Sequence, residues 1–260
     1  MTTIASNLQG VRERIAQACA SARRPVEDVT LLAVSKTFGP DAVREAVAAG
    51  QRRFGENYLQ EAVDKIVAIR AWEAQGLRLA DSCPSAQPAQ AHALPTEWHC
   101  IGPIQSNKTR LVAEHFDWVH TVDRLKIAQR LSEQRPPGLA PLQVCIQVNV
   151  DGGANKSGVP PDEALALACA VAALPRLVLR GLMTIPEPAP DQAMQRAVHL
   201  RTRALFEAMA ARLPAGVVWD TLSMGMSADL EAAIDAGSTL VRVGTAIFGG
   251  RARPTQRPVG

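Results

Sequence analysis

Lys36 has the residue type and the position for covalent chemistry with a carbonyl compound. It follows the apolar run 31–35, with the sequence LLAVS, and a TFGP segment comes directly after it. A lysine at the exit of a buried strand is partly desolvated, which leaves more neutral amine to attack a carbonyl carbon. A strand-end lysine can also extend its ammonium group into solvent, so the interpretation of Lys36 depends on other residues.

Two glycine-bearing segments near the end of the chain have the features of a phosphate site. Residues 223–227, with the sequence SMGMS, lead from a predicted strand into a helix, and VGT follows at 243–245. Glycine lets backbone amides approach an anion closely. Each segment alone is typical of a tight turn, but together they favour a phosphate. The candidate contacts are Ser223, Gly225, Met226, Gly244 and Thr245.

Arg242 stands two residues before Gly244, so the two positions share one face of a predicted strand. A buried arginine is costly unless it is paired, and here it would hold the phosphate or donate to a ring nitrogen. An amine that forms an imine, together with a phosphate site, is what a binding site for pyridoxal 5′-phosphate requires. The spacing equally permits a Schiff-base aldolase that acts on a sugar phosphate.

Short β-rich runs alternate with longer helical patterns along the chain. The predicted strands are 30–36, 52–56, 97–102, 117–122, 142–150, 177–184, 219–224 and 239–247. The predicted helices are 40–50, 57–72, 123–134, 160–174, 190–213 and 227–237, and an extra amphipathic helix precedes the first strand.

This alternation indicates parallel strands joined by crossover helices. It fits a closed (β/α)8 TIM barrel of about 250 residues, and no GxGxxG motif follows the first strand as in an open doubly wound sheet. In such a barrel the functional residues lie at the carboxyl ends of the strands. That rule places Lys36, Asn57 and the two glycine-bearing segments at one mouth.

We expect a single domain over residues 1–250. Residues 79–96 are rich in Ala, Pro, Gln and Ser, which predicts a flexible surface insertion. Residues 251–260 contain two prolines and three arginines and predict a frayed tail.

The composition excludes several classes of protein. The net charge of +3 is too small to indicate nucleic-acid binding. The histidines lack the spacing of metal ligands. No apolar stretch approaches the roughly 18 residues of a membrane span, and the first residues do not resemble a signal peptide. The five scattered cysteines suit thiols in a reducing compartment, so we expect a cytoplasmic protein.

Six segments of the chain form a pattern that is found together in one known family. They are LLAVSKT, RRFGENYLQE, WHCIGPIQSNKTRLV, VNVDGGANKSG, GLMTI and LSMGMSADLEAAIDAGSTLVRVGTAIFG. The pattern resembles the pyridoxal phosphate homeostasis proteins, single-domain relatives of the alanine racemase barrel, over about residues 4–250. Two features depart from the family: Cys100 stands where an aromatic residue is usual, and the 79–96 segment is longer.

The resemblance implies a role for most candidate residues. Lys36 would form the internal aldimine with pyridoxal 5′-phosphate, and Asn57 would lie beside the cofactor ring. Ser223, Gly244 and Thr245 would hold the phosphate, and Arg242 would face the pyridine nitrogen. A guanidinium cannot accept the ring proton, so the ring would stay largely unprotonated and act as a weaker electron sink.

We therefore expect a carrier that sequesters and supplies the cofactor, with no catalytic residue. The racemase relatives use a tyrosine from a separate β-domain as a second acid/base group, and we expect Tyr58, the one tyrosine here, to pack instead. The alternatives are a racemase-like pyridoxal phosphate enzyme or, less favoured, a Schiff-base aldolase. The expected partners are pyridoxal phosphate and its recipient enzymes, without nucleic acid, membrane or metal, and the chain is expected to be a monomer.

Overall fold

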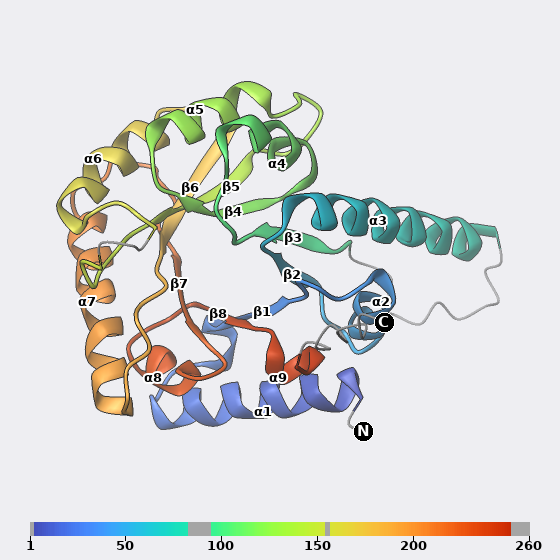
Figure 1. Cartoon of the computed structure of the whole chain (residues 1–260), viewed down its shortest axis with the longest axis horizontal. Helices are drawn as coiled ribbons and strands as arrows, with labels where there is room; N and C mark the ends of the chain where they lie inside the picture. Colours follow the sequence, from blue (N-terminus) through green and yellow to red (C-terminus); the bar gives the residue numbers. More distant parts are fainter. Residues whose placement is uncertain (1–2, 83–94, 154–156, 251–260) are drawn as a thin grey trace, which may run out of the picture.

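The computed structural model describes residues 3–82, 95–153 and 157–250. In this part of the chain eight parallel strands form a closed barrel in sequential order, and the last strand pairs with the first (Figure 1). The strands are β1 (Thr30–Val34), β2 (Arg53–Glu56), β3 (Glu97–Cys100), β4 (Trp118–Val122), β5 (Leu142–Gln147), β6 (Leu177–Met183), β7 (Thr221–Met226) and β8 (Leu240–Val243). The predicted barrel is thereby confirmed.

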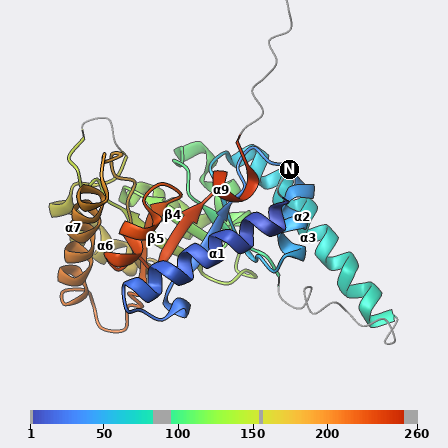
Figure 2. The ribbon, with the colours of Figure 1, turned by 90° about the horizontal axis from the view of Figure 1, so that it is seen from below.

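Helices surround the barrel (Figures 1 and 2). They are α1 (Ile4–Ser21), α2 (Pro40–Ala48), α3 (Leu59–Ser82), α4 (Thr109–His115), α5 (Leu125–Gln134), α6 (Pro161–Ala172), α7 (Gln192–Ala210), α8 (Leu230–Asp235) and α9 (Thr245–Phe248), with the 3-10 helices η1 (Val26–Asp28) and η3 (Ser106–Lys108). Helix α1 is the extra N-terminal helix that the sequence predicts, and it packs against α2, α8 and α9.

Helix α3 is longer than its sequence pattern predicts. It continues to Ser82 and extends beyond the body of the barrel (Figure 1), so the first residues of the predicted 79–96 insertion are helical. Residues 83–94 of that insertion and the predicted tail, 251–260, lie outside the described residues.

The barrel interior combines two small apolar clusters with buried polar groups. Alternate strand positions face opposite sides of the sheet, and most outward ones join the large core under the helices. The small clusters are Leu32, Val34, Ile101 and Leu240, and separately Trp118, Cys145 and Met183. Buried polar residues occupy positions of the same parity on β3, β4, β7 and β8, among them His99, His120, Ser223 and Arg242. Polar groups in this position require hydrogen-bond partners.

Several strand ends differ from the prediction by a few residues, and two of these differences concern the glycine-bearing segments. The predicted strand 239–247 is too long, because β8 ends at Val243 and Thr245 begins α9. Strand β7 runs on to Met226, so Gly225 and Met226 belong to the strand rather than to the loop after it.

Among the described cysteines, Cys100 and Cys145 behave as small apolar core residues. Both are fully buried, and burial raises the pKa of each thiol to about 12. Such thiols are unreactive. Cys83 lies outside the described residues. Of the helices within residues 3–82, 95–153 and 157–250, none has the length and apolar character that crossing a bilayer requires.

Candidate functional site

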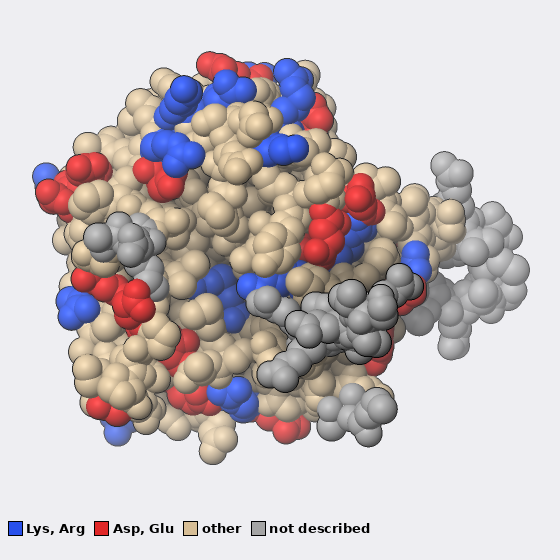
Figure 3. Space-filling view, viewed as in Figure 1, with Lys and Arg blue, Asp and Glu red and all other residues tan. Residues whose placement is uncertain are grey.

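A cavity of about 400 Å³ opens at the carboxyl ends of the strands. This volume lies within the range of small-molecule sites. Figure 3 looks onto this face and shows basic side chains near its middle. The lining residues are Val34, Lys36, Thr37, Phe38, Asn57, Ile101, Ile185, Met226, Ser227, Ala228, Arg242, Gly244, Thr245 and Gly249.

Lys36 is half-buried directly after β1, and the backbone beyond it is held in an unusual conformation. Thr37 has φ 69°, in the left-handed region that a β-branched residue rarely adopts. The N–H of Thr37 donates to Glu61 Oε1 at 2.7 Å, which compensates for part of this strain. Strain of this kind concentrates at functional sites, and here it fixes the position from which the Lys36 side chain enters the cavity.

A buried ion pair supports the ends of β1 and β2 beneath Lys36. Lys65 Nζ lies 2.7 Å from Glu56 Oε1 and 3.1 Å from Glu61 Oε1, and it donates to the carbonyl oxygen of Ser35 at 2.8 Å. Ser35 Oγ donates to Glu56 Oε1 at 2.6 Å. Burial raises the pKa of Glu56, although the attraction of Lys65 opposes the shift. This cluster therefore joins α3 to the two strands that present Lys36 and Asn57.

Asn57 contributes an unsatisfied polar atom to the cavity wall. Its Oδ1 is buried and accepts no hydrogen bond from any described residue. The backbone of Asn57 is packed against Gly102, where an added Cβ would lie 2.3 Å from the Asn57 carbonyl oxygen. Any side chain at position 102 would displace Asn57. A buried acceptor without a partner is rare in folded proteins, so a ligand group fits here.

Arg242 is a buried cation at the base of the cavity, with 4 % of its surface exposed. Its Nη1 donates to the carbonyl oxygen and to Oγ of Ser223, at 2.8 and 2.7 Å, and its Nη2 donates to Thr184 O at 2.8 Å. Burial lowers its pKa to about 10, so it stays charged at neutral pH, and the negative charge of Asp229 favours that charge. A guanidinium has five N–H groups, which leaves donors for a ligand.

Ser223 and Gly225 do not line the cavity, in contrast to what the sequence indicates. The Ser223 side chain is fully buried beneath Arg242, so its hydroxyl is directed into the barrel interior. The serine of this segment that lines the cavity is Ser227. Gly225 has φ 91°, and a Cβ there would lie 2.4 Å from Ala233 Cβ. Glycine at this position allows β7 to pack closely against α8.

The loop after β7 is held by Asp229. The N–H of Met226 donates to Asp229 Oδ1 at 2.7 Å, and His199 Nε2 lies 2.9 Å from Asp229 Oδ2. Burial opposes ionisation of Asp229, but these hydrogen bonds outweigh it and lower the pKa of the carboxyl group. The charged carboxylate therefore keeps Met226 and Ser227 in position at the cavity.

The structure brings six of the eight predicted site residues to one cavity: Lys36, Asn57, Met226, Arg242, Gly244 and Thr245. Ser227, in the SMGMS segment, also lines the cavity, although the sequence analysis did not select it as a candidate contact. Tyr58 is 50 % exposed and does not line the cavity, so it does not pack as expected. No group of three or more metal-ligating side chains occurs among the described residues.

Comparison with known proteins defines first the class of this barrel. A family model for the N-terminal domain of alanine racemase matches residues 6–252. The alanine racemase of Corynebacterium glutamicum shares the fold, with a TM-score of 0.59, 17 % identity, and coverage of 98 % of this chain and 62 % of the racemase.

More similar proteins narrow the assignment. The pyridoxal phosphate homeostasis protein of Pseudomonas aeruginosa is 57 % identical over 96 % of this chain and 97 % of its own length. The Escherichia coli homologue of the same name is 51 % identical over 96 % and 98 %. PipY of Synechococcus elongatus, solved with PLP bound, has a TM-score of 0.73 and 32 % identity over 95 % of this chain and 100 % of PipY. The chain belongs to the pyridoxal phosphate homeostasis protein family.

Proposed function

We propose that this chain binds pyridoxal 5′-phosphate at Lys36 and sequesters and supplies it, without turning over a substrate. One observation carries the proposal: the Lys36 amine, the Arg242 guanidinium and the hydroxyl groups of Ser227 and Thr245 line the same small cavity. The names of the relatives and the PLP-bound PipY structure support the choice of cofactor.

The residues present fit the cofactor chemically. The orphaned Oδ1 of Asn57 and the spare donors of Arg242 are polar groups that a bound ring would satisfy. Val34, Ile101 and Ile185 provide apolar walls. When bound, the cofactor supplies an aldehyde, and condensation of an aldehyde with a primary amine forms a carbon–nitrogen double bond and releases water.

Each lining residue has a distinct role in this proposal. Lys36 supplies the amine, and Asn57 contacts the ring. Arg242 donates toward the ring nitrogen and cannot accept a proton from it. Ser227 and Thr245 donate hydroxyl hydrogens to the phosphate, and Gly244 lets the backbone approach it.

The proposal of a carrier rests on the titratable groups at the site. Among the described residues that line the cavity, the titratable groups are Lys36 and Arg242. The Lys36 amine would be occupied by the attached cofactor, and the Arg242 guanidinium stays protonated. Tyr58, the candidate for a second acid/base group, lies outside the cavity. The buried thiols Cys100 and Cys145 suit a reducing cytoplasm. Action as a monomer, and delivery to pyridoxal phosphate enzymes, remain part of this proposal.

A titration tests the proposal against its alternatives. Adding pyridoxal 5′-phosphate to the purified protein is expected to produce the long-wavelength band of the bound cofactor, with saturation at equimolar cofactor and no racemisation of alanine. Racemisation at an ordinary enzymatic rate of about 1–10³ s⁻¹ would show a racemase-like enzyme instead. Cleavage of a sugar phosphate without a band would show an aldolase.

Thr245→Val is expected to raise the Kd for the cofactor at least about tenfold. The substitution keeps the shape of the side chain but removes a hydrogen bond to a charged phosphate, which contributes about 1.5–3 kcal/mol. Ser227→Ala is expected to act similarly, and Thr30→Val, at the other end of the barrel, serves as the matched control. Fluorescence titration measures the Kd, and unchanged values in both site variants would place the phosphate elsewhere.

A further inference from the structure

A chain of hydrogen bonds runs through the barrel interior from Arg242 to the opposite mouth. Arg242 Nη1 lies 2.7 Å from Ser223 Oγ, which lies 2.8 Å from His120 Nδ1. His120 Nε2 lies 2.8 Å from His99 Nδ1, and His99 Nε2 lies 2.9 Å from Glu97 Oε1. The chain thus links β8, β7, β4 and β3, and Glu97 is the first residue of β3.

The two ends of the chain dictate the direction of every hydrogen bond in it. An ionised carboxylate only accepts, so Glu97 requires the His99 proton on Nε2, and His99 Nδ1 then accepts from His120 Nε2–H. His120 Nδ1 in turn accepts from the Ser223 hydroxyl, whose oxygen accepts from Arg242. A guanidinium only donates, so both ends require the same direction, and both imidazoles are neutral in it.

The electrostatic surroundings agree with this assignment. Burial lowers the pKa of His99, and it lowers that of His120 further with help from nearby positive charge, including Arg242. Partial burial opposes ionisation of Glu97, but the hydrogen bond from His99 and the charge of Arg53 outweigh it and lower the pKa of the carboxyl group to about 2. At neutral pH the chain therefore has a carboxylate at one end, a guanidinium at the other and neutral rings between them.

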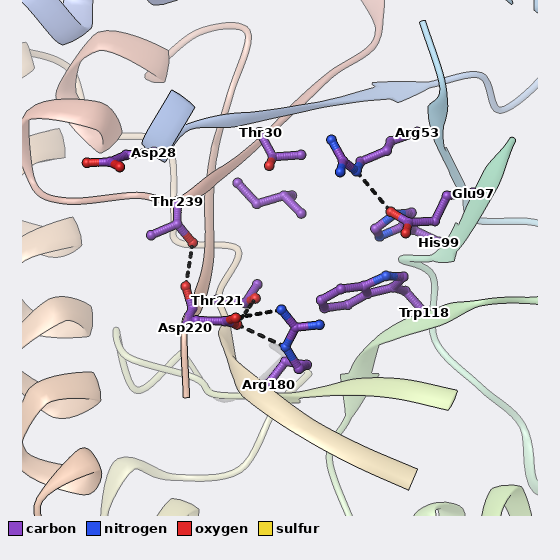
Figure 4. A pocket seen from close by; sticks show the side chains of 11 residues that line it. Asp28, Thr30, Arg53, Glu97, His99, Trp118, Arg180, Asp220, Thr221 and Thr239 are labelled. Atoms are coloured by element: carbon purple, nitrogen blue, oxygen red, sulfur yellow. Dashed lines mark hydrogen bonds and ion pairs between the residues drawn. The ribbon is translucent and has the colours of Figure 1, made fainter. Parts of the chain in front are cut away.

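The far end of the chain lies in a separate cavity of about 290 Å³ at the amino ends of the strands (Figure 4). Glu97 accepts there from Arg53 Nε at 3.0 Å, and its side chain is 36 % exposed. The His99 ring stacks on Trp118, with the ring centroids 5.2 Å apart. The Arg180 guanidinium lies over the Trp118 ring, 4.7 Å from the ring centroid. These contacts fix the far end of the chain in place.

We propose that His120 and His99 are positioning residues that hold Arg242, through Ser223, in one orientation at the cofactor site, and that Glu97 at the opposite mouth sets the direction of the chain. The effect on the cofactor rests on the proposed function above. The direction itself is a property of the protein without cofactor. Simple packing would not require one particular tautomer at both rings, and this difference makes the proposal testable.

Nitrogen NMR of histidine-labelled, cofactor-free protein reads the tautomer of each ring directly. At neutral pH we expect His99 and His120 to be uncharged, each with its proton on Nε2 and a bare Nδ1. A proton on Nδ1 of either ring, or a charged ring, would reverse or break the chain and overturn the proposal.

Glu97→Gln tests whether the opposite mouth controls this direction. The amide has nearly the same shape but both donates and accepts, so the His99 and His120 rings are expected to lose their single tautomer. The Kd for pyridoxal 5′-phosphate is expected to rise about fivefold or more, at the lower end of couplings between distant sites. Arg53→Gln is the matched control, because it removes the ion-pair partner of Glu97 at the same mouth and leaves the chain intact.

The outcomes separate this inference from the proposed function. Unchanged tautomers in Glu97→Gln, an unchanged Kd despite altered tautomers, or an equal effect of Arg53→Gln would each contradict control by Glu97. If the wild-type protein does not bind the cofactor, the proposed function fails. In that case the tautomers of the wild type and of Glu97→Gln alone decide whether the chain of hydrogen bonds orients Arg242.

Discussion

Replacement of Lys36 by alanine is expected to abolish the long-wavelength absorption band that pyridoxal 5′-phosphate acquires on binding. The band requires a carbon–nitrogen double bond, and no other lysine lines the cavity among the described residues. The proposed contacts to Arg242, Ser227 and Thr245 remain in this variant. We therefore expect it to bind the cofactor weakly and without the band. Absorption spectroscopy under saturating cofactor measures the effect.

Lys126→Ala provides the matched control for this variant. Lys126 is an exposed lysine in α5, distant in the fold from the β1 end that carries Lys36. We expect it to retain the full band. An intact band in Lys36→Ala, with a normal Kd, would mean that the cofactor is attached elsewhere and would contradict the assignment of the site.

Replacement of Lys65 by methionine is expected to destabilise the protein by about 3–5 kcal/mol. The side chains of Lys65 and Glu56 are 2 % and 0 % exposed, so the variant leaves the Glu56 carboxylate buried without its cation. Urea unfolding measures the loss as a lower midpoint. Lys108→Met, at an exposed lysine, is expected to have little effect.

Two further measurements separate the loss of charge pairing from the loss of packing. The double variant Glu56→Gln with Lys65→Met removes both charges and is expected to recover much of the lost stability. The deficit of Lys65→Met should also depend on pH. Burial raises the pKa of Glu56 in the folded state and Lys65 opposes that shift, so removal of Lys65 raises this pKa further. The deficit of the variant therefore grows as pH rises above the folded-state pKa of Glu56 in the wild type, and it shrinks in acid. A deficit independent of pH and of Glu56 would indicate packing alone.

The barrel itself was predictable because its signals are local. Apolar runs, proline at Pro40 and glycine at Gly50 mark the alternating strands and helices, and eight such units without a GxGxxG motif fit the closed barrel better than an open doubly wound sheet. The rule that functional groups lie at the carboxyl ends of the strands then placed Lys36, Asn57 and Thr245 at one mouth, and all three line the cavity there. The ends of elements were less predictable: β8 stops before Gly244 because the chain turns there into α9.

The part of the site that sequence reasoning missed depends on contacts between distant segments. His120 and Ser223 are 103 positions apart, so no local pattern indicates their hydrogen bond. Each histidine alone resembles an ordinary packed residue. Ser223 faces the barrel interior from a strand, and the parity of its position cannot show whether its hydroxyl reaches the cavity or stops at the Arg242 side chain that lies between them. Lys65 lies in a helical pattern that gives no sign of its buried carboxylate partner.

The most direct test of the account is chemical trapping of the attached cofactor. Borohydride delivers hydride to the carbon of the carbon–nitrogen double bond, and the nitrogen takes up a proton, which makes the attachment permanent. Peptide mass mapping after this reduction is expected to locate the added mass on Lys36. Added mass on a different lysine, or none at all in protein saturated with pyridoxal 5′-phosphate, would contradict the account.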